Sequence, residues 1–322
     1  MAHTLTASTI LVTGATGVIG RVLCPRLRAA GHTVFAPSRA ELDLSGPTGS
    51  WTLPERCDLV IHAAASRDRA QAGPSRFPEE VRINVDATAR LLDWARSVRV
   101  RGFLFVSTLS VLEPTADLAV LLDESSRCVA PRDRQPGTAP TLRHAYGLTK
   151  RWAEELVEGY SGEFEATAVV RPSMTYGEGF GVRARWSAQL SAGTPFGLAG
   201  DDGHRYAPVH VDDVVDVLVR WAAAPESLFC HVAGPEAQTE RALVTRLATE
   251  LSLEPTFVDD DEPAVSLASA SRVADARYPG RVRTWWPGAT LVEPQCDPPF
   301  RESAIGTMER LRQDDGREPR RS

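Results

Sequence analysis

Tyr146 and Lys150 are the residues whose types and spacing most clearly suggest chemistry. They lie four residues apart in a segment, Tyr146–Tyr160, whose apolar spacing predicts a helix, so they share one helical face. A nearby ammonium favours the phenolate and lowers the pKa of a tyrosine, so Tyr146 can act as general acid or general base. Lys150 is the only lysine in a chain with 36 Lys and Arg residues, which indicates that an amine is required there. The pair predicts proton transfer to a carbonyl or from a carbinol.

A glycine-rich turn near the N-terminus predicts a dinucleotide site. Gly14, Gly17 and Gly20 lie between a predicted strand, Ser8–Thr13, and a predicted helix, Val18–Ala30. The first glycine permits a tight turn, the second lets the backbone approach a pyrophosphate, and the third allows close helix packing. The N-terminus of the helix offers unpaired N–H groups to the anion. The ligands predicted from this turn are Gly14, Thr16, Gly17, Val18 and Ile19.

The choice of dinucleotide is set after the second predicted strand, Thr33–Ala36. An acidic residue there would hold the adenosine ribose, but this sequence has Ser38 and Arg39. A carboxylate would repel a 2′-phosphate, whereas these two side chains could bind one, so NADP(H) is favoured and NAD(H) remains possible. The alternative is that Arg39 is a solvated arginine at a helix start. Asp43 is a candidate acceptor for the adenine amine.

Short apolar segments alternate with helical patterns along the rest of the chain. This alternation predicts an α/β fold, a Rossmann-type doubly wound parallel sheet with a smaller, discontinuous C-terminal substrate-binding lobe. The further predicted strands and helices are Leu59–Ala63, Glu79–Ser97, Phe103–Ser107, Ala166–Val170, Tyr206–Ala224, Leu228–Val232 and Glu240–Leu251. We assign residues 1–176 and 206–234 to the dinucleotide-binding domain, 177–205 and 235–300 to the lobe, and 301–322 to a flexible tail.

Composition narrows the possible partners. The net charge is −6, which argues against a nucleic-acid surface. The five cysteines stand singly, with no metal-ligand spacing, so neither a disulfide framework nor a metal site is expected. The N-terminal segment has neither a signal-peptide pattern nor an anchor, so we expect a cytoplasmic protein. A small molecule is the expected partner, without membrane or nucleic acid.

Several separate segments resemble the extended short-chain dehydrogenase/reductase family, also called the NAD-dependent epimerase/dehydratase family. The opening TGATGVIG resembles the TGxxGxxG of that family, and DLVIHAAA its fourth-strand signature. RINVDATARLLDWA is similar to its NVxGTxxLLxxA helix, and RPSMTYG to its RPxxxYG. The resemblance covers residues 8 to 250. It adds Ala63, Ala64, Ala65 and Asn84 to the predicted cofactor site.

The resemblance also implies roles for individual residues. Tyr146 would be the catalytic acid/base, with Lys150 as its electrostatic partner and a ribose ligand, while Pro172 and Ser173 would line the nicotinamide. The family has a catalytic hydroxyl three residues before the valine of a VYG signature, and counting back from Val111 selects Thr108. Because VYG is replaced by Val-Leu-Glu here, two neighbours remain alternatives. These are Ser107, also predicted to bind cofactor, and Ser110, also predicted to bind substrate.

Departures from the family pattern favour one reaction. Dehydratases of the family follow the threonine with Asp-Glu, but Thr108 is followed by Leu-Ser, and the acidic ribose clamp common in epimerases is replaced by Ser-Arg. We therefore expect NADPH-dependent reduction of a ketone, with Tyr146 as proton donor and Thr108 hydrogen-bonded to the developing alkoxide. The alternatives are a nucleotide-sugar epimerase with tightly bound NAD, a ketone or aldehyde reductase for a non-sugar substrate, and a noncatalytic dinucleotide sensor.

The expected substrate is a nucleotide-activated deoxysugar ketone. Arg183, Arg185 and Arg205 fall in the variable lobe, where guanidinium groups could hold a pyrophosphate, although solvated surface arginines are an equally good interpretation. A homodimer is expected by resemblance, because many relatives pair through a helix bundle that includes the Tyr-Lys helix.

Overall fold

The protein is organised around a six-stranded parallel sheet. The computed structural model describes residues 7–66, 77–130, 142–177, 179–260 and 264–268, so the tail predicted at 301–322 lies outside the described residues. The strands are β1 (Thr9–Thr13), β2 (Thr33–Phe35), β3 (Leu59–His62), β4 (Gly102–Val106), β5 (Ala166–Pro172) and β10 (Leu228–Val232). Their order is β10-β5-β4-β3-β1-β2, and every neighbouring pair is parallel. The predicted Rossmann-type sheet is confirmed.

The strand order reverses beside β1. The chain passes from β1 to β2 on one side and then crosses to β3 on the other, which makes the carboxyl ends of β1 and β3 a topological switch point. Ligands of open α/β sheets bind in the crevice outside such ends. The predicted glycine turn follows β1, and the predicted Ala63–Ala65 segment follows β3, so both lie at this crevice.

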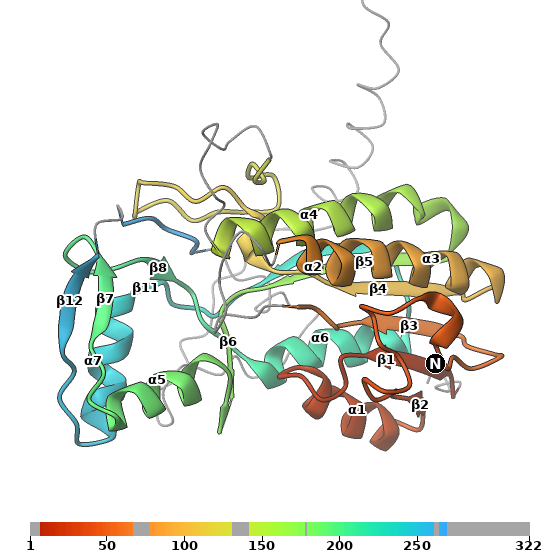
Figure 1. Cartoon of the computed structure of the whole chain (residues 1–322), viewed down its shortest axis with the longest axis horizontal. Helices are drawn as coiled ribbons and strands as arrows, with labels where there is room; N and C mark the ends of the chain where they lie inside the picture. The colour runs from red at the N-terminus through yellow and green to blue at the C-terminus, as the bar shows by residue number, and fades with distance from the viewer. Residues whose placement is uncertain (1–6, 67–76, 131–141, 178, 261–263, 269–322) are drawn as a thin grey trace, which may run out of the picture.

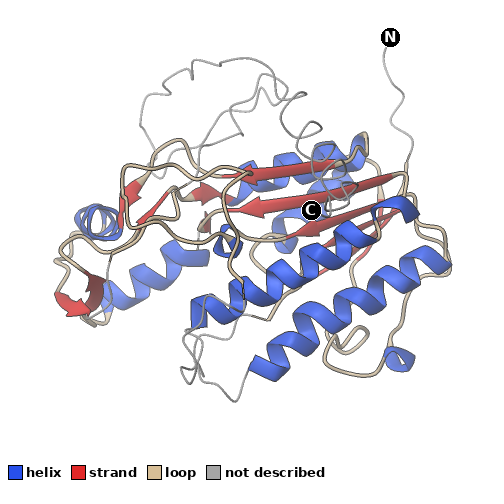
Figure 2. Cartoon of the chain, turned by 90° about the horizontal axis from the view of Figure 1, so that it is seen from above, coloured by secondary structure: helices blue, strands red, loops and turns tan. Residues whose placement is uncertain are grey.

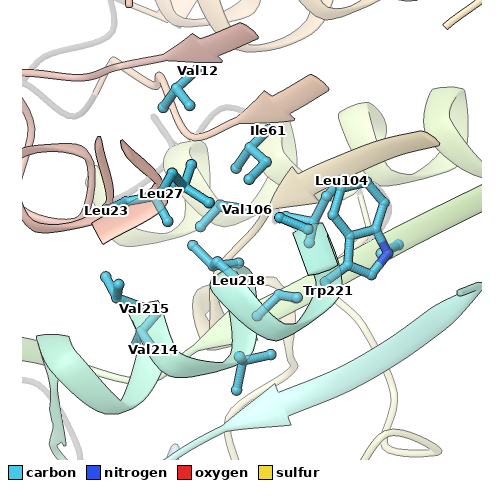
Figure 3. Close-up of a cluster of buried hydrophobic side chains, with 14 of the residues drawn as sticks. Val12, Leu23, Leu27, Ile61, Leu104, Val106, Val214, Val215, Leu218 and Trp221 are labelled. Atoms are coloured by element: carbon cyan, nitrogen blue, oxygen red, sulfur yellow. The ribbon is translucent and has the colours of Figure 1, made fainter. Parts of the chain in front are cut away.

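Helices cover both faces of the sheet. Helices α1 (Gly20–Ala29) and α6 (Val211–Ala223) cover one face, and α3 (Ala87–Ser97) and α4 (Leu142–Gly159) cover the other (Figures 1 and 2). Because side chains alternate across a strand, successive residues of β1 enter different cores. Val12 packs with the side chains of α1 and α6 (Figure 3), and Leu11 packs with those of α3 and α4.

Apolar burial on both faces fixes the register of the strands. Figure 3 shows Ile61 and Leu104 from the sheet facing Leu27 of α1 and Leu218 of α6, and all four side chains are fully buried. Each such burial contributes about 1.5–3 kcal/mol. A slip of one residue would turn these side chains to the opposite face, so the register that places the strand ends is strongly specified.

The helix predicted at Glu79–Ser97 is not regular throughout. It consists of α2 (Phe77–Val81), a π-helical turn at Arg82–Asp86, and α3. The predicted helix is therefore present without a gap, but it contains one wide turn that apolar spacing alone does not reveal. The π turn buries Asn84, which is 1% exposed. The predicted helix Val18–Ala30 also begins later, at Gly20.

The remaining elements include a smaller group with a core of its own, in which α5 (Gly181–Ser191), β7 (Phe196–Ala199), α7 (Glu240–Glu250) and β12 (Phe257–Asp260) lie at the left of Figure 1. The short strands β6 (Thr175–Gly177), β8 (Arg205–Tyr206), β9 (Val209–His210) and β11 (Gln238–Thr239) complete the set. Trp186 and Leu190 of α5 pack with Leu243 and Leu247 of α7. No helix in the described ranges has the length and apolar character needed to cross a membrane.

Candidate active site

The glycine turn lies against the end of β3 with no space for side chains. Gly14 has a φ of +72°, and a Cβ there would lie 2.7 Å from the amide nitrogen of Ala64. A Cβ at Gly20 would lie 2.2 Å from the carbonyl oxygen of Gly14. The first turn of α1 has no acidic residue, and Ile19 provides no side-chain cap. The N-terminal amides of α1 therefore have no capping side chain and favour an anion.

A cavity of about 490 Å³ opens beside this turn. It is formed by the turn after β1, the segment after β2, the segment after β3, and two residues of α2 and the π turn. The lining residues are Thr13, Gly14, Ala15, Thr16, Pro37, Ser38, Arg39, Leu42, Asp43, Leu44, Ser45, Ala64, Ala65, Ser66, Glu79 and Ile83. Seven residues of the predicted cofactor site come together here. The predicted Gly17, Val18, Ile19 and Ala63 do not line the cavity.

Several lining residues were not predicted. Ser45, Ser66, Glu79 and Ile83 come from loops and a helix edge, where no spacing rule of the sequence selects them. Ser45 holds Asp43 in place, because its hydroxyl and its amide both donate to Asp43 Oδ1, at 2.6 and 3.0 Å. These bonds lower the pKa of the Asp43 carboxyl, so Asp43 stays ionised and retains acceptor capacity.

Lys150 is buried and attached to the sheet. Its side chain is almost fully enclosed, Nζ donates to the carbonyl oxygen of Val106 at 2.8 Å, and Nζ lies 3.8 Å from the ring centroid of Phe105. Burial lowers the pKa of Lys150 to about 7, and the negative charge of Glu154 partly opposes this shift. Tyr146, one turn earlier on α4, is 8% exposed. The structure therefore places the predicted phenol and ammonium on one buried face of α4.

Thr108 and Ser110 lie in a short 3-10 turn against the same helix. Thr108 Oγ1 accepts a hydrogen bond from the amide of Ser110 at 3.2 Å and donates to Ser110 Oγ at 3.3 Å. A Cβ at Gly147 would lie 2.1 Å from the carbonyl oxygen of Ser110, so α4 touches this turn backbone to backbone. Gly147 directly follows Tyr146. The two hydroxyls predicted from the sequence are thus brought to the part of α4 that carries the phenol.

Asn84 connects α4 with the cavity. Its Oδ1 accepts from the amide of Ser66 at 2.7 Å, and its Nδ2 donates to the carbonyl of Ser66 at 3.1 Å and to Thr149 Oγ1 at 3.0 Å. Thr149 Oγ1 in turn donates to the carbonyl of Tyr146 at 3.0 Å. The predicted Asn84 therefore fixes a cavity-lining residue relative to the helix that carries Tyr146 and Lys150.

A buried histidine extends this network to the glycine turn. Thr88 Oγ1 donates its one hydrogen to the carbonyl of Asn84 at 2.8 Å, so it must accept from His62 Nε2 at 3.0 Å. His62 Nδ1 is then the acceptor for Thr13 Oγ1, at 2.6 Å. Burial and the charge of Lys150 lower the pKa of His62 to about 3. His62 is a neutral positioning residue, which we missed although it lies in DLVIHAAA.

The ends of β4 and β5 supply two further predicted residues. Ser107 is buried, and its Oγ has no hydrogen-bond partner among the described residues. Its amide donates to the carbonyl of Val170 at 2.7 Å, which fixes its position at the crevice edge. Ser173 follows Pro172 at the end of β5, and its amide donates to Val232 at 2.8 Å. A buried hydroxyl without a partner is costly, and a ligand atom can satisfy it.

A buried ion pair attaches α4 to β5. Arg171 Nε and Nη2 donate to the two carboxylate oxygens of Glu154 at 2.8 and 2.6 Å, and both residues are at most 1% exposed. Arg151 also donates to Glu154, at 3.2 Å. A bidentate pair of this kind fixes orientation as well as distance. It holds the helix of Tyr146 and Lys150 against the strand that ends at Pro172.

The predicted substrate arginines are differently placed. Arg183 of α5 forms an ion pair with Glu250 of α7. Arg205 of β8 donates to the carbonyl of Leu118 and, at 3.5 Å, to that of Ala237. Arg185 is an exposed residue of α5. Arg183 and Arg205 therefore have protein partners, and the role of the three arginines in substrate binding stays a prediction.

Comparison with known proteins agrees with this geometry. The sequence profile of the NAD dependent epimerase/dehydratase family matches residues 10–233. The chain belongs to this family. It is an enzyme of the NAD(P)-dependent oxidoreductase or epimerase type, and the predicted resemblance is confirmed.

Individual relatives are reductases. The dTDP-4-dehydrorhamnose reductase of Streptomyces griseus is 28% identical over 304 residues, 87% of this chain and 88% of the relative. The 4-hydroxy-2-methyl-3-oxo-4-farnesyl-3,4-dihydroquinoline-1-oxide ketoreductase of Stigmatella aurantiaca is 33% identical over 181 residues, 52% of this chain. That match spans half the length of the ketoreductase. The solved structure of MoeE5 in complex with UDP-glucose and NAD has a TM-score of 0.68 at 23% identity, covering 96% of this chain and all of that one.

The described residues fit a nicotinamide dinucleotide. The space at Gly14 and Gly20 is filled by backbone, so the turn can receive a pyrophosphate only on its cavity side. The cavity combines this turn with acceptors and the Arg39 guanidinium after β2. Ser107 provides a buried hydroxyl that has no hydrogen-bond partner within the described ranges. The residues that would hold the adenosine half are thus those lining the cavity.

Proposed function

We propose that the enzyme reduces a ketone with NADPH, on a nucleotide-activated deoxysugar. The observation that carries the proposal is the close approach of Gly147 to Ser110, which brings the Tyr146–Lys150 face of α4 to the Thr108 turn at the crevice edge. Such a site offers a proton donor and a hydroxyl to one carbonyl oxygen.

Each residue has a distinct role in this reaction. The bound nicotinamide supplies the hydride that reduces the carbonyl carbon. Tyr146 donates its phenolic proton to the carbonyl oxygen, and Lys150, when protonated, stabilises the phenolate that remains. Thr108 can rotate its hydroxyl from Ser110 Oγ toward the developing alkoxide, because the bond that it gives up is long, at 3.3 Å.

Cofactor and substrate are proposed on separate grounds. Ser38 and Arg39 line the cavity at the end of β2, where a 2′-phosphate would bind, and this supports NADPH. The sugar nucleotide is supported by the name of the Streptomyces griseus relative, which matches most of both chains.

Replacement of Tyr146 by Phe tests the catalytic assignment. We expect Tyr146→Phe to lower the turnover of dTDP-4-dehydrorhamnose with NADPH by about 100-fold or more, because a general acid contributes on that scale. The dissociation constant of NADPH, measured by fluorescence titration, should stay within about twofold of the wild-type value. Wild-type turnover in Tyr146→Phe would contradict the assignment.

The same purified protein distinguishes the proposed reaction from two alternatives, an epimerase and a reductase of non-sugar ketones. NAD released from the purified protein on denaturation, together with interconversion of nucleotide-sugar epimers, would favour an epimerase, and MoeE5 was solved with UDP-glucose and NAD. Reduction of a non-sugar ketone but not of nucleotide sugars would favour a reductase like the Stigmatella relative.

A further inference from the structure

The turn after β2 contains a carboxylate in contact with Ser38. Glu41 Oε2 accepts a hydrogen bond from the amide of Ser38 at 2.7 Å, and the amides of Glu41 and Leu42 both donate to the carbonyl of Ser38, at 3.1 and 2.9 Å. The hydrogen bond from the Ser38 amide lowers the pKa of Glu41, so this carboxylate is ionised at neutral pH.

This contact lies at the part of the cavity where cofactor choice is decided. Ser38, Arg39 and Asp43 all line the cavity. Glu41 lies between Arg39 and Asp43 in the chain, is exposed, and borders the cavity through its hydrogen bond to Ser38. Arg39 is exposed and makes no hydrogen bond within the described part of the chain. The turn therefore presents one guanidinium together with two ionised carboxylates, rather than the purely cationic pocket that Ser-Arg alone would predict.

A 2′-phosphate and a 2′-hydroxyl meet this turn differently. The phosphate needs donors, and Glu41 occupies the amide of Ser38 while adding repulsion. A ribose hydroxyl needs an acceptor, which a carboxylate provides. We propose that Glu41 is a specificity-determining residue that weakens binding of the 2′-phosphate of NADP(H) and supports the ribose hydroxyl of NAD(H). This inference rests on the proposed function, and it makes the enzyme one that accepts both cofactors.

The local geometry also has a purely structural interpretation. Ser38 and Glu41 have the S-x-x-E spacing of a capping box, in which the glutamate satisfies the serine amide. Glutamine can form the same hydrogen bond without the charge. Glu41→Gln therefore preserves the turn and removes only the repulsion, which separates the two interpretations.

The test measures binding of cofactor fragments, so it needs no substrate. We would titrate wild type, Glu41→Gln and Arg39→Gln with 2′,5′-ADP and 5′-ADP by calorimetry, and then with NADPH and NADH. Glu55→Gln is the matched control, because Glu55 is exposed like Glu41 but does not belong to the Ser38 turn. Because exposed charges are screened by salt, each titration is repeated at about 0.5 M ionic strength.

We expect Glu41→Gln to bind 2′,5′-ADP and NADPH about 5- to 20-fold more tightly than wild type, the size expected when one charge near a dianion in water is removed. The affinities for 5′-ADP and NADH should be unchanged or weaker, and the gain should shrink in high salt. Arg39→Gln should shift the same ratio in the opposite direction, and Glu55→Gln should not shift it.

The inference and the function on which it rests fail in different ways. An unchanged ratio of 2′,5′-ADP to 5′-ADP affinity in Glu41→Gln, or an equal change in both, would overturn the role of Glu41 while leaving the enzyme a dinucleotide-binding reductase. Absence of NADPH and NADH binding in the wild type would overturn the proposed function, and the inference with it.

Discussion

The protonation state of Lys150 depends on the groups that surround its amine. Its amine is enclosed by Phe105 and the carbonyl of Val106, and burial opposes the ammonium while Glu154 favours it. The charged form that the proposed reaction uses is thus only partly populated at neutral pH in the ligand-free protein. A bound ribose would add hydrogen-bond acceptors, so cofactor binding should raise the pKa of Lys150.

The single lysine makes this pKa directly measurable. In protein labelled with ¹³C at lysine Cε, one resonance should titrate with a midpoint near 7 in the folded protein. The same sample in urea should show the unperturbed midpoint, about 10.4. Because the folded pKa lies below the unfolded one, the unfolded state binds more protons between these values, so Lys150 makes the free energy of unfolding rise with pH across that window. A folded-state midpoint above about 9.5 would refute the assigned environment.

Among the elements, α4 carries Tyr146 and Lys150, so its position determines where these two side chains lie. It is attached to the crevice at three places: Lys150 to the end of β4, Gly147 to the Ser110 turn, and Glu154 to Arg171 of β5. Sequence periodicity predicted the helix, and the YxxxK spacing predicted its face. The attachments themselves could not be predicted, because they join segments that are distant along the chain and depend on backbone proximity.

Gly147→Ala tests whether this close packing matters. The added Cβ would lie 2.1 Å from the carbonyl oxygen of Ser110, so α4 must shift away from the turn. We expect a loss of about 1–3 kcal/mol in the free energy of unfolding, with a fall in turnover at saturating cofactor. Gly159→Ala is the control on the same helix, because a Cβ there meets nothing within 4 Å. Its stability should be unchanged or slightly higher.

Equal stability and turnover in the two glycine variants would show that the backbone contact does not position the Tyr146 face. Urea unfolding followed by circular dichroism gives the first quantity, and initial rates with NADPH give the second. A loss of turnover without a loss of stability would show that the contact of Gly147 orients the Tyr146 face but does not stabilise the fold.

At the scale of the whole molecule, the sequence predicted the alternating sheet and the glycine turn correctly, because both depend on local apolar patterns and on glycine. The wide turn at Asn84 escaped prediction since its hydrogen bonds, to Ser66 and Thr149, are nonlocal. The role proposed for Glu41 was missed for a different reason. Its bond to Ser38 is local and has the S-x-x-E spacing of a capping box, but that spacing carries no information about cofactor choice.

Arg205 joins three segments that are distant along the chain. It lies in β8, donates to Leu118 beyond the Ser110 turn, and donates to Ala237 before β11. The backbone of Arg205 also bonds to Val265 and Leu267, and Ser266 pairs with Thr115. The segment that follows Thr108 and Ser110 is thus connected to the smaller group of elements. A guanidinium with two carbonyl partners can serve this connection, whereas the sequence predicted that it binds substrate.

Arg205→Ala separates the two roles. If the guanidinium connects the segments, its loss should lower the free energy of unfolding by about 2 kcal/mol, since hydrogen bonds to a charged group contribute on that scale. If it binds substrate pyrophosphate, KM should rise severalfold with unchanged stability, because only substrate contacts are lost. Arg56→Ala, at an exposed arginine outside the cavity, controls for loss of positive charge. From the hydrogen bonds we expect the loss of stability. A rise in KM without a loss of stability would instead show that Arg205 binds substrate.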